Sequence, residues 1–405
     1  MFGWEFPPFN KGGLGVACHG ITKGLSNKGV STTFVIPKAP EDADGSHVKL
    51  IIASNVKGIK IKEVSSPMAA YMTNSEYQER VRHLLLHGKG TSKDDIYGQD
   101  LFNEVERYAI RAKKIAKNES FDVIHAHDWM TYKAGIEAKK STGKPLVVHI
   151  HATEFDRTGG NGVNQHVYDI EKSGFDKADV ICAVSNFTKN KVVNHYGIDP
   201  KKIHVVHNAV EFTNFDEETP KLSGKDKIVL FLGRITLQKG PDYFVKAAKK
   251  VIDQDPNVKF IVAGSGDMMP QMVEMAAEHG LSNKMLFAGF LKGKDIDRAY
   301  KMADLYVMPS VSEPFGITPL EAMRNGTPVL ISKQSGVSEV VQNCLKVDFW
   351  DTDEIANKML SVLKYSSLHR CLQEEGGREV MKFNWDEPAQ KCIDAYKTAI
   401  EKRGV

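Results

Sequence analysis

The chain has 405 residues, which is long enough for two domains that each bury their own hydrophobic core. Its formal net charge of +3 is too small to predict binding to nucleic acid or to an anionic membrane surface, and we find neither an apolar run that could span a bilayer nor a signal-peptide pattern. The five cysteines are scattered and lack metal-binding spacing, so we expect reduced thiols in a cytoplasmic protein.

Short apolar runs alternate with amphipathic segments, such as 98–117, along the whole chain. The predicted strands are 31–35, 121–126, 145–150, 178–183 and 202–207 in the first half, and 228–232, 259–263, 285–288, 304–308, 328–331 and 345–348 in the second. Strands that alternate with helices indicate parallel sheets. We therefore expect an α/β protein with a doubly wound parallel sheet in each half.

A polar, turn-rich stretch separates the two halves. We place the domains at 1–212 and 227–384, with a linker at 213–226. The remaining residues, 385–405, contain a predicted amphipathic helix.

Near the N-terminus, Gly12 and Gly13 follow Lys11 and precede a predicted helix at 16–26. Glycines at a helix start let a ligand approach the unpaired N–H groups, so this turn is a candidate phosphate site. A plain strand-to-helix turn with a solvated lysine is the alternative.

Two His-x-His pairs occupy predicted strand ends. His125 and His127 precede Asp128, and His149 is followed after one residue by His151. On a strand, this spacing directs both imidazoles of a pair to one face, as in some zinc enzymes. Because no separate downstream His, Cys or carboxylate completes a recognisable site, we predict no metal.

Two cations follow the first predicted strand of the second half. Arg234 and Lys239 are five residues apart, and two cations beyond a strand end can hold a diphosphate, the guanidinium by a planar fork and the ammonium as a point charge. Two solvated surface cations are the alternative. The turn at Gly264 is a weaker candidate, since a Gly-Ser-Gly turn is common after any strand.

Two glutamates, Glu313 and Glu321, stand eight residues apart on either side of a predicted strand-to-helix turn. Gly316, Ile317 and Thr318 carry the N–H groups at the expected helix start, which suit a phosphate. A carboxylate at Glu321 can accept hydrogen bonds from vicinal sugar hydroxyls. A glutamate that only complements the helix dipole is the alternative.

Two Asp-x-Asp pairs offer a different way to hold a diphosphate, through a divalent cation. No strand directly precedes Asp42 and Asp44, and Asp351 and Asp353 stand where a helix cap is expected. We interpret both as chance or capping.

The spacing of Glu313 and Glu321 around Phe315-Gly316 resembles the signature of retaining GT-B glycosyltransferases, and the Arg234 and Lys239 segment extends the match. The His-Ala-His-Asp-Trp run that starts at His125 resembles glycogen and starch synthases, as does the Gly-Gly-Leu turn. In that turn, Asn10 stands where the family has its lysine. The resemblance covers nearly the whole chain.

The resemblance implies a GT-B fold, with two Rossmann-like domains facing a cleft, a donor-binding second domain, and a last helix that crosses back to the first. It also implies that His151 lies beside the donor sugar, that Asp128 faces the cleft, that Glu313 holds the sugar and Glu321 the ribose, and that the nucleotide donor needs no metal. His125 and His149 are then expected to be structural histidines whose hydrogen bonds are satisfied. Because the chain begins where the family's first strand is ending, we also expect residues before Met1.

The expected function is glucosyl transfer from ADP- or UDP-glucose to a glycan acceptor, as in glycogen or starch synthases. The alternatives are another retaining transferase of this group, with a small sugar acceptor or a role in sucrose, trehalose or surface-glycan synthesis, and a non-catalytic protein that binds glycan or nucleotide. We expect no partner nucleic acid and no cofactor.

Overall fold

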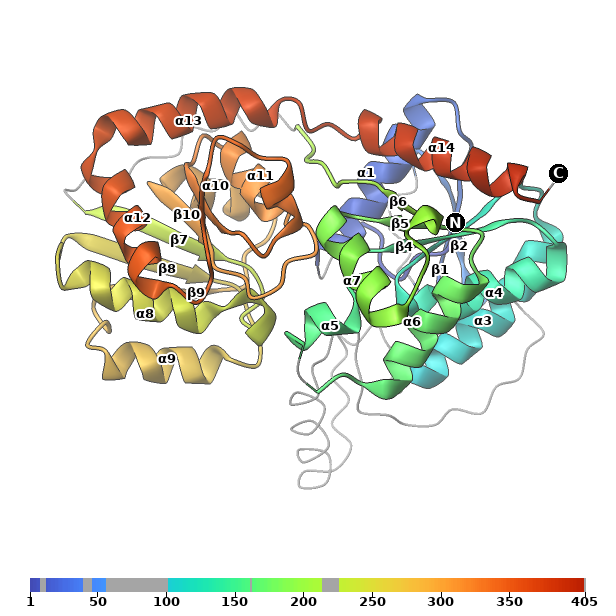
Figure 1. Ribbon diagram of the computed structural model, residues 1–405, viewed down its shortest axis with the longest axis horizontal. Helices are drawn as coiled ribbons and strands as arrows, with labels where there is room; N and C mark the ends of the chain where they lie inside the picture. Colours follow the sequence, from blue (N-terminus) through green and yellow to red (C-terminus); the bar gives the residue numbers. More distant parts are fainter. Residues whose placement is uncertain (8–11, 39–45, 56–100, 161, 213–225, 404–405) are drawn as a thin grey trace, which may run out of the picture. The chain divides into compact units, whose positions relative to one another are not determined.

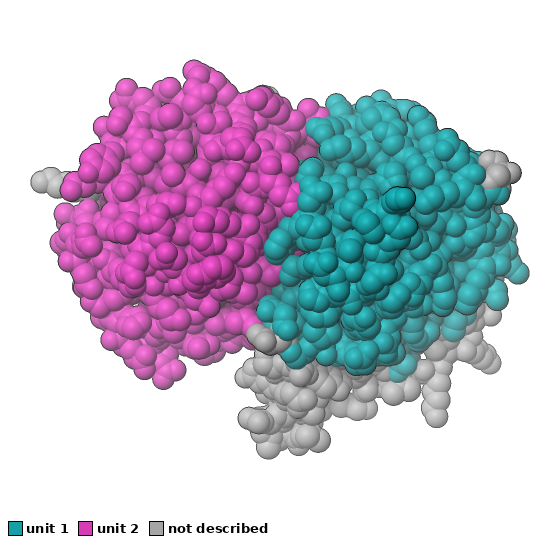
Figure 2. Space-filling view, viewed as in Figure 1, with its two compact units in different colours: residues 1–208, 385–405 teal, residues 209–384 magenta. Residues whose placement is uncertain are grey.

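The computed structural model describes residues 1–7, 12–38, 46–55, 101–160, 162–212 and 226–403. The chain forms two compact units, residues 1–208 with 385–405 and residues 209–384 (Figure 2). The linker predicted at 213–226 lies outside the described residues, apart from Asp226.

The first unit contains parallel strands with helices between them (Figure 1). The order of its described elements is α1 (Gly13–Asn27), β1 (Thr33–Ile36), β2 (Lys49–Ile52), η1 (Ala53–Asn55), α3 (Leu101–Asn118), β3 (Ile124–His127), α4 (Trp129–Thr142), β4 (Leu146–Ile150), α5 (Glu154–Arg157), α6 (Gln165–Lys177), β5 (Val180–Ala183), α7 (Asn186–Tyr196), η2 (Pro200–Lys202), β6 (Ile203–Val205) and, at the C-terminus, α14 (Asp386–Glu401).

Residue Phe2 joins the two groups of strands in this unit. The strands pair in the orders β1-β2 and β3-β4-β5-β6, and Phe2 makes parallel bridges to Val35 of β1 and Ala126 of β3. The chain therefore starts in the middle of a doubly wound arrangement, and the residues after Phe2, β1 and β3 leave the sheet at the same edge.

The second unit has a six-stranded parallel sheet in the order β12-β11-β10-β7-β8-β9. Its elements are β7 (Lys227–Leu232), η3 (Leu237–Lys239), α8 (Pro241–Ile252), β8 (Val258–Ala263), α9 (Met269–Glu278), β9 (Met285–Gly289), α10 (Lys294–Met302), β10 (Leu305–Met308), α11 (Thr318–Arg324), β11 (Val329–Ser332), η4 (Gly336–Glu339), β12 (Leu345–Val347), α12 (Thr352–Lys364) and α13 (Ser366–Val380). The order reverses between β7 and β10, which makes their carboxyl ends the topological switch point where such sheets bind ligands.

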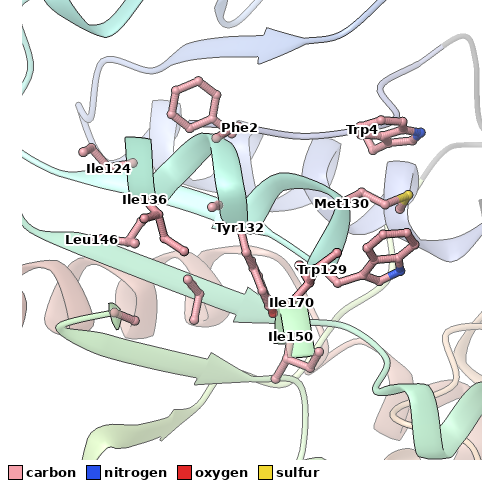
Figure 3. Close-up of a cluster of buried hydrophobic side chains, with 14 of the residues drawn as sticks. Phe2, Trp4, Ile124, Trp129, Met130, Tyr132, Ile136, Leu146, Ile150 and Ile170 are labelled. Carbon is pink, nitrogen blue, oxygen red and sulfur yellow. The ribbon is translucent and has the colours of Figure 1, made fainter. Parts of the chain in front are cut away.

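Each unit has its own hydrophobic core. Figure 3 shows part of the first, where Ile136 of α4 lies beside Leu146 of β4 and the Tyr132 ring of α4 reaches toward Ile150 of β4. In the second, Phe244 of α8 packs edge-on against Phe260 of β8, with ring centroids 5.7 Å apart. These cores fix the strand ends from which the candidate site residues project.

All eleven predicted strands are present, and their ends differ from the prediction by no more than three residues. The predicted α/β class with parallel sheets is confirmed. The prediction missed β2, a short edge strand whose side chains are only half-buried. No described helix is long and apolar enough to cross a membrane.

Helix α14 belongs to the first unit and packs on α1 through two glycines. A Cβ at Gly24 would lie 2.4 Å from the carbonyl oxygen of Trp385 and 2.9 Å from the Cβ of Ala389. A Cβ at Gly20 would lie 2.0 Å from the Trp385 ring. Only glycine allows the two helices to approach this closely.

Replacing Gly24 with Ala should therefore destabilise the first unit. The new methyl group meets a backbone oxygen that cannot rotate away, so we expect a loss of about 1–3 kcal/mol in the free energy of unfolding. Differential scanning calorimetry measures the effect. Gly377→Ala is the contrasting change, because a Cβ there meets nothing within 4 Å. This helical position should gain roughly 0.5–1 kcal/mol. An unchanged melting temperature for Gly24→Ala would contradict the close packing.

Candidate active site

The candidate site in the second unit lies at the carboxyl ends of β7 and β10. The loop after β7 carries Arg234 and Lys239, and the loop after β10 carries Glu313. The ammonium of Lys239 forms an ion pair with the carboxylate of Glu313, which also accepts a hydrogen bond from the Ser310 hydroxyl at 3.3 Å. Residues 74 positions apart in the sequence thus meet at the switch point.

Gln238 ties these two loops together. Its carbonyl oxygen accepts from the N–H of Val311 at 2.9 Å, and its side-chain amide donates to the carbonyl oxygen of Ser312 at 3.0 Å. Its amide oxygen accepts from the guanidinium of Arg234, also at 3.0 Å. Gln238 is buried, so it holds Arg234 on one side and the Glu313 loop on the other. No sequence motif singled out Gln238.

Glycines permit the close approach of the surrounding backbones. Gly240 has φ +62°, and a Cβ there would lie 2.2 Å from the carbonyl oxygen of Pro309. Gly264 has φ +142°, and its Cβ would lie 1.8 Å from the carbonyl oxygen of Gly233. Packing alone therefore explains glycine at Gly264, and its predicted contact with the donor stays a prediction.

Glu321 lies one turn into α11, which begins at Thr318 with Pro319 in its first turn, as predicted. The hydroxyl of Tyr300 donates to the Glu321 carboxylate at 3.2 Å. Burial raises the pKa of Glu321, although nearby Arg324 and the Tyr300 hydroxyl oppose this change. The carboxylate is thus held in a fixed place and has hydrogen-bonding capacity left for a ligand.

The start of α11 is held from the β10 side. Tyr306 donates from its hydroxyl to the Thr318 Oγ1 at 2.9 Å and to the carbonyl oxygen of Leu232 at 3.2 Å. Gly316 has φ +96°, which favours glycine, and Ile317 is the residue before the helix. The structure therefore brings the segment with Arg234 and Lys239 and the segment with Glu313 and Glu321 to one end of one sheet.

In the first unit, the two His-x-His pairs lie side by side. His127 of β3 is in register with His149 of β4, and the four rings form a stack in which neighbouring centroids are 4.2 to 5.3 Å apart. The Nδ1 of His125 shares a hydrogen bond with the Tyr396 hydroxyl at 2.7 Å, which agrees with a structural role for His125. His149 has no hydrogen bond to any described residue at either ring nitrogen, so the expectation that its hydrogen bonds are satisfied is wrong; its ring is held by stacking on its neighbours.

Asp128 fixes the backbone that carries His151. Its carboxylate accepts from the N–H of His151 at 2.7 Å and, more weakly, from the N–H of Ala152 at 3.4 Å. Asp128 has φ 58°, the only positive φ of a non-glycine residue in the described part of the chain. Such strain persists where the surrounding structure enforces it, often at functional sites.

Two groups of side chains could be considered as metal ligands. The first is His125, His127 and His149, and the second is Cys18, His127 and His151; in each, the ligand atoms lie within 4.8 Å of one another. In the first group the rings are within 33° of parallel, so their in-plane lone pairs do not converge on one point. In the second, the Nδ1 of His127 and the Nε2 of His151 are already hydrogen-bonded to each other at 3.0 Å. Neither group fits an ion as arranged, and the absence of a metal stays a prediction.

The remaining predicted residues have different outcomes. Asp351 caps α12 by accepting from the N–H of Glu354 at 2.9 Å, so the interpretation as a cap is confirmed. Asp42, Asp44 and Lys11 lie outside the described residues.

Gly12 and Gly13 stand at the start of α1, which begins earlier than predicted. A Cβ at either glycine would meet nothing within 4 Å, so packing does not explain them. Their predicted place at a donor stays a prediction.

Two parallel, doubly wound units, one with cations and carboxylates at its switch point, define the class of GT-B glycosyltransferases. The family model for glycosyltransferase family 4 matches residues 11–213, and the model for glycosyl transferases group 1 matches residues 213–378. The chain belongs to the group 1 glycosyltransferases.

Known proteins resemble the chain over its full length. An uncharacterized glycosyltransferase of Methanocaldococcus jannaschii is 29% identical over 100% of this chain and 99% of its own. Glycogen synthase of Mycobacterium tuberculosis is 25% identical over 100% of this chain and 95% of its own. The solved structure of sucrose-phosphate synthase from Thermosynechococcus elongatus has a TM-score of 0.74 at 17% identity and covers 96% of this chain and 94% of its own.

Proposed function

We propose that the protein is a retaining glycosyltransferase that moves a glucosyl group from ADP- or UDP-glucose to a glycan acceptor, as glycogen synthases do. The observation that carries this proposal is the meeting of Arg234, Lys239 and Glu313 at the switch point of the second unit. Two cations there suit a diphosphate, and a carboxylate suits the hydroxyls of a sugar.

The Lys239 and Glu313 pair is mostly buried, with side chains 20% and 8% exposed. A diphosphate that reaches this pair adds negative charge, so the ammonium can turn toward it while Glu313 is released toward the sugar. Negative charge grows on the diphosphate as the glycosidic bond breaks, and fixed cations stabilise that charge more in the transition state than in the ground state. This arrangement supplies the electrostatic stabilisation without a metal ion.

Similarity to glycogen synthase along the whole chain supports a glucosyl donor and a glycan acceptor. The structural similarity to sucrose-phosphate synthase supports the second candidate, transfer to a small sugar. We also keep the cytoplasm as the proposed location.

Screening nucleotide-sugars for transfer and hydrolysis, with glycogen or with small sugars as acceptors, tests the proposal. We expect ADP-glucose or UDP-glucose to extend glycogen. Transfer only to a small sugar would support the second candidate. Nucleotide binding with neither transfer nor hydrolysis would favour a non-catalytic binding protein and contradict the proposal.

The two glutamates should differ in the step they affect. Glu321→Ala should weaken nucleoside-diphosphate binding by roughly 10- to 100-fold, because hydrogen bonds to a charged group are lost at the ribose. Glu313→Ala should reduce transfer while leaving this affinity unchanged or higher, since Lys239 loses its carboxylate partner. Titration calorimetry and initial rates measure both effects.

Glu274→Ala, which removes an exposed carboxylate from α9, is the control. Equal losses of nucleoside-diphosphate affinity in the Glu313 and Glu321 variants would show that the division of roles is wrong.

A further inference from the structure

His127 and His151 share one hydrogen bond deep in the first unit. His127 is fully buried and His151 is half-buried, and the Nδ1 of His127 lies 3.0 Å from the Nε2 of His151. A hydrogen bond between two ring nitrogens requires that one carries the proton and the other a lone pair. Which nitrogen donates decides the tautomer of both residues.

Both rings are neutral at ordinary pH. Burial, together with the neighbouring His125 and His151, lowers the pKa of His127 well below its usual value. Burial also lowers the pKa of His151, an effect that the Asp128 carboxylate partly opposes. Each ring therefore carries one proton, so assigning the proton of His127 also assigns that of His151.

The far side of the His127 ring shows where its proton lies. The Nε2 of His127 is buried and has no hydrogen-bond partner among the described residues. A proton on that nitrogen would be a buried, unpaired N–H, and such orphaned donors are rarer in proteins than under-satisfied acceptors. The lower-energy arrangement places the proton on Nδ1, where it is donated to His151.

We propose that His127 is a positioning residue that sets the tautomer of His151, so that His151 keeps its only proton on Nδ1 and presents an N–H donor to the ligand. The consequence for the ligand rests on the proposed function. The Nε2 of His151 is occupied by His127, and no described residue is hydrogen-bonded to its Nδ1. His151 then donates a hydrogen bond to an oxygen of the bound sugar, and it does not act as a general base.

Asp128 and His127 together fix the orientation of this donor. The Asp128 carboxylate holds the backbone N–H of His151, and His127 holds the ring on its Nε2 side. Backbone and ring are therefore restrained independently. A histidine whose backbone and ring are both restrained can direct Nδ1 without rearranging when a substrate binds, which is the condition for a preorganised donor.

Long-range proton–nitrogen NMR correlation on ¹⁵N-histidine-labelled protein tests the tautomer directly. In the wild type we expect a protonated Nδ1 and a bare Nε2 for both residues, assigned by the loss of signals in single variants. A proton on the Nε2 of His151 would overturn the proposal. This measurement needs no enzyme activity, so it remains decisive even if the proposed function fails.

Two variants of His127 separate tautomer control from packing. His127→Leu removes the donor, so His151 should lose its Nδ1–H preference and transfer should fall about tenfold, the value of one hydrogen bond. His127→Asn places an amide N–H₂ near the position of the His127 Nδ1. It should restore much of the Nδ1–H preference of His151 and much of the transfer rate. The KM for the donor should change little, because the change concerns the orientation of one N–H group.

His149→Asn is the matched control. Its ring stacks on His151 at a centroid distance of 4.5 Å and lies 5.3 Å from His127, and it has no hydrogen bond to a described residue. This change disturbs the same stack but should leave the His151 tautomer unaltered. If it shifts the tautomer and lowers transfer as much as His127→Leu does, packing and not the hydrogen bond governs His151, and the proposal is wrong.

Discussion

Replacing either Arg234 or Lys239 with Ala should lower turnover by roughly 10²-fold or more, judged from losses when one preorganised donor is removed. The physical reason is that, under the proposed function, both cations face the departing diphosphate at the switch point, and negative charge grows on that diphosphate as the bond breaks. Arg234 is held by Gln238, and Lys239 is held by Glu313. Initial rates at saturating donor measure the effect.

Lys249→Ala is the control for this pair. Its side chain is 40% exposed and pairs with Asp253, the residue directly after α8, away from the switch point, so turnover should stay near the native value. A diphosphate clamp formed by Arg234 and Lys239 also predicts that added Mg²⁺ or Mn²⁺ leaves the turnover of the wild type unchanged. Near-native turnover in both the Arg234 and the Lys239 variants would refute the assignment of the clamp.

The strands could be predicted from the sequence because each is a short apolar run between turn residues. Parallel strands that are buried on both faces commonly have this sequence pattern. The edge strand β2 was missed because its half-buried side chains carry a weaker pattern. The segment Leu50-Ile51-Ile52 was the available signal. The start of α1 was predicted too late, at residue 16, because its first turn contains Gly13 and Gly15. Intrinsic propensity does not favour glycine in a helix.

The site could be predicted only where one continuous segment carries its residues. The segment with Arg234 and Lys239 was recognised as one unit, and the segment with Glu313 and Glu321 as another. Their ion pair could not be predicted, because it depends on β7 and β10 being neighbours in the sheet. Gln238 was missed for the same reason, since its partners Val311 and Ser312 belong to the other loop.

The histidine stack shows a similar limit. The spacing in each His-x-His pair predicts that both imidazoles lie on one face of the strand. The structure agrees, since the two rings of each pair lie against each other. That the pairs form one stack depends on the register of β3 with β4, which sets His127 opposite His149. The hydrogen bond between His127 and His151 follows from that register, so it could not be read from either pair alone.

His151→Ala should abolish transfer, with a loss of at least about 10²-fold, while nucleoside diphosphate still binds. The reason is that His151 belongs to the first unit, whereas Arg234, Lys239 and Glu321 all belong to the second. Under the proposed function, removing the imidazole takes away a preorganised donor to the sugar and leaves the nucleotide contacts intact. Transfer assays and calorimetry with nucleoside diphosphate separate the two effects. His166→Ala, which removes an exposed imidazole from α6, should change neither.

The anomeric configuration of the product completes this test. For the proposed retaining transfer, the resemblance to retaining GT-B glycosyltransferases implies that the acceptor hydroxyl attacks the anomeric carbon from the side of the leaving diphosphate. The bond from that carbon to the phosphate oxygen breaks as the bond to the acceptor oxygen forms, and the hydroxyl proton passes to the departing phosphate. His151, with its proton on Nδ1, then orients the sugar and takes no proton. Anomer-resolved NMR should show an α-linked glucoside from an α-linked donor, and mass spectrometry should show no covalent glycosyl-enzyme. A β-linked product would exclude retention, and with it the roles proposed for Glu313 and His151.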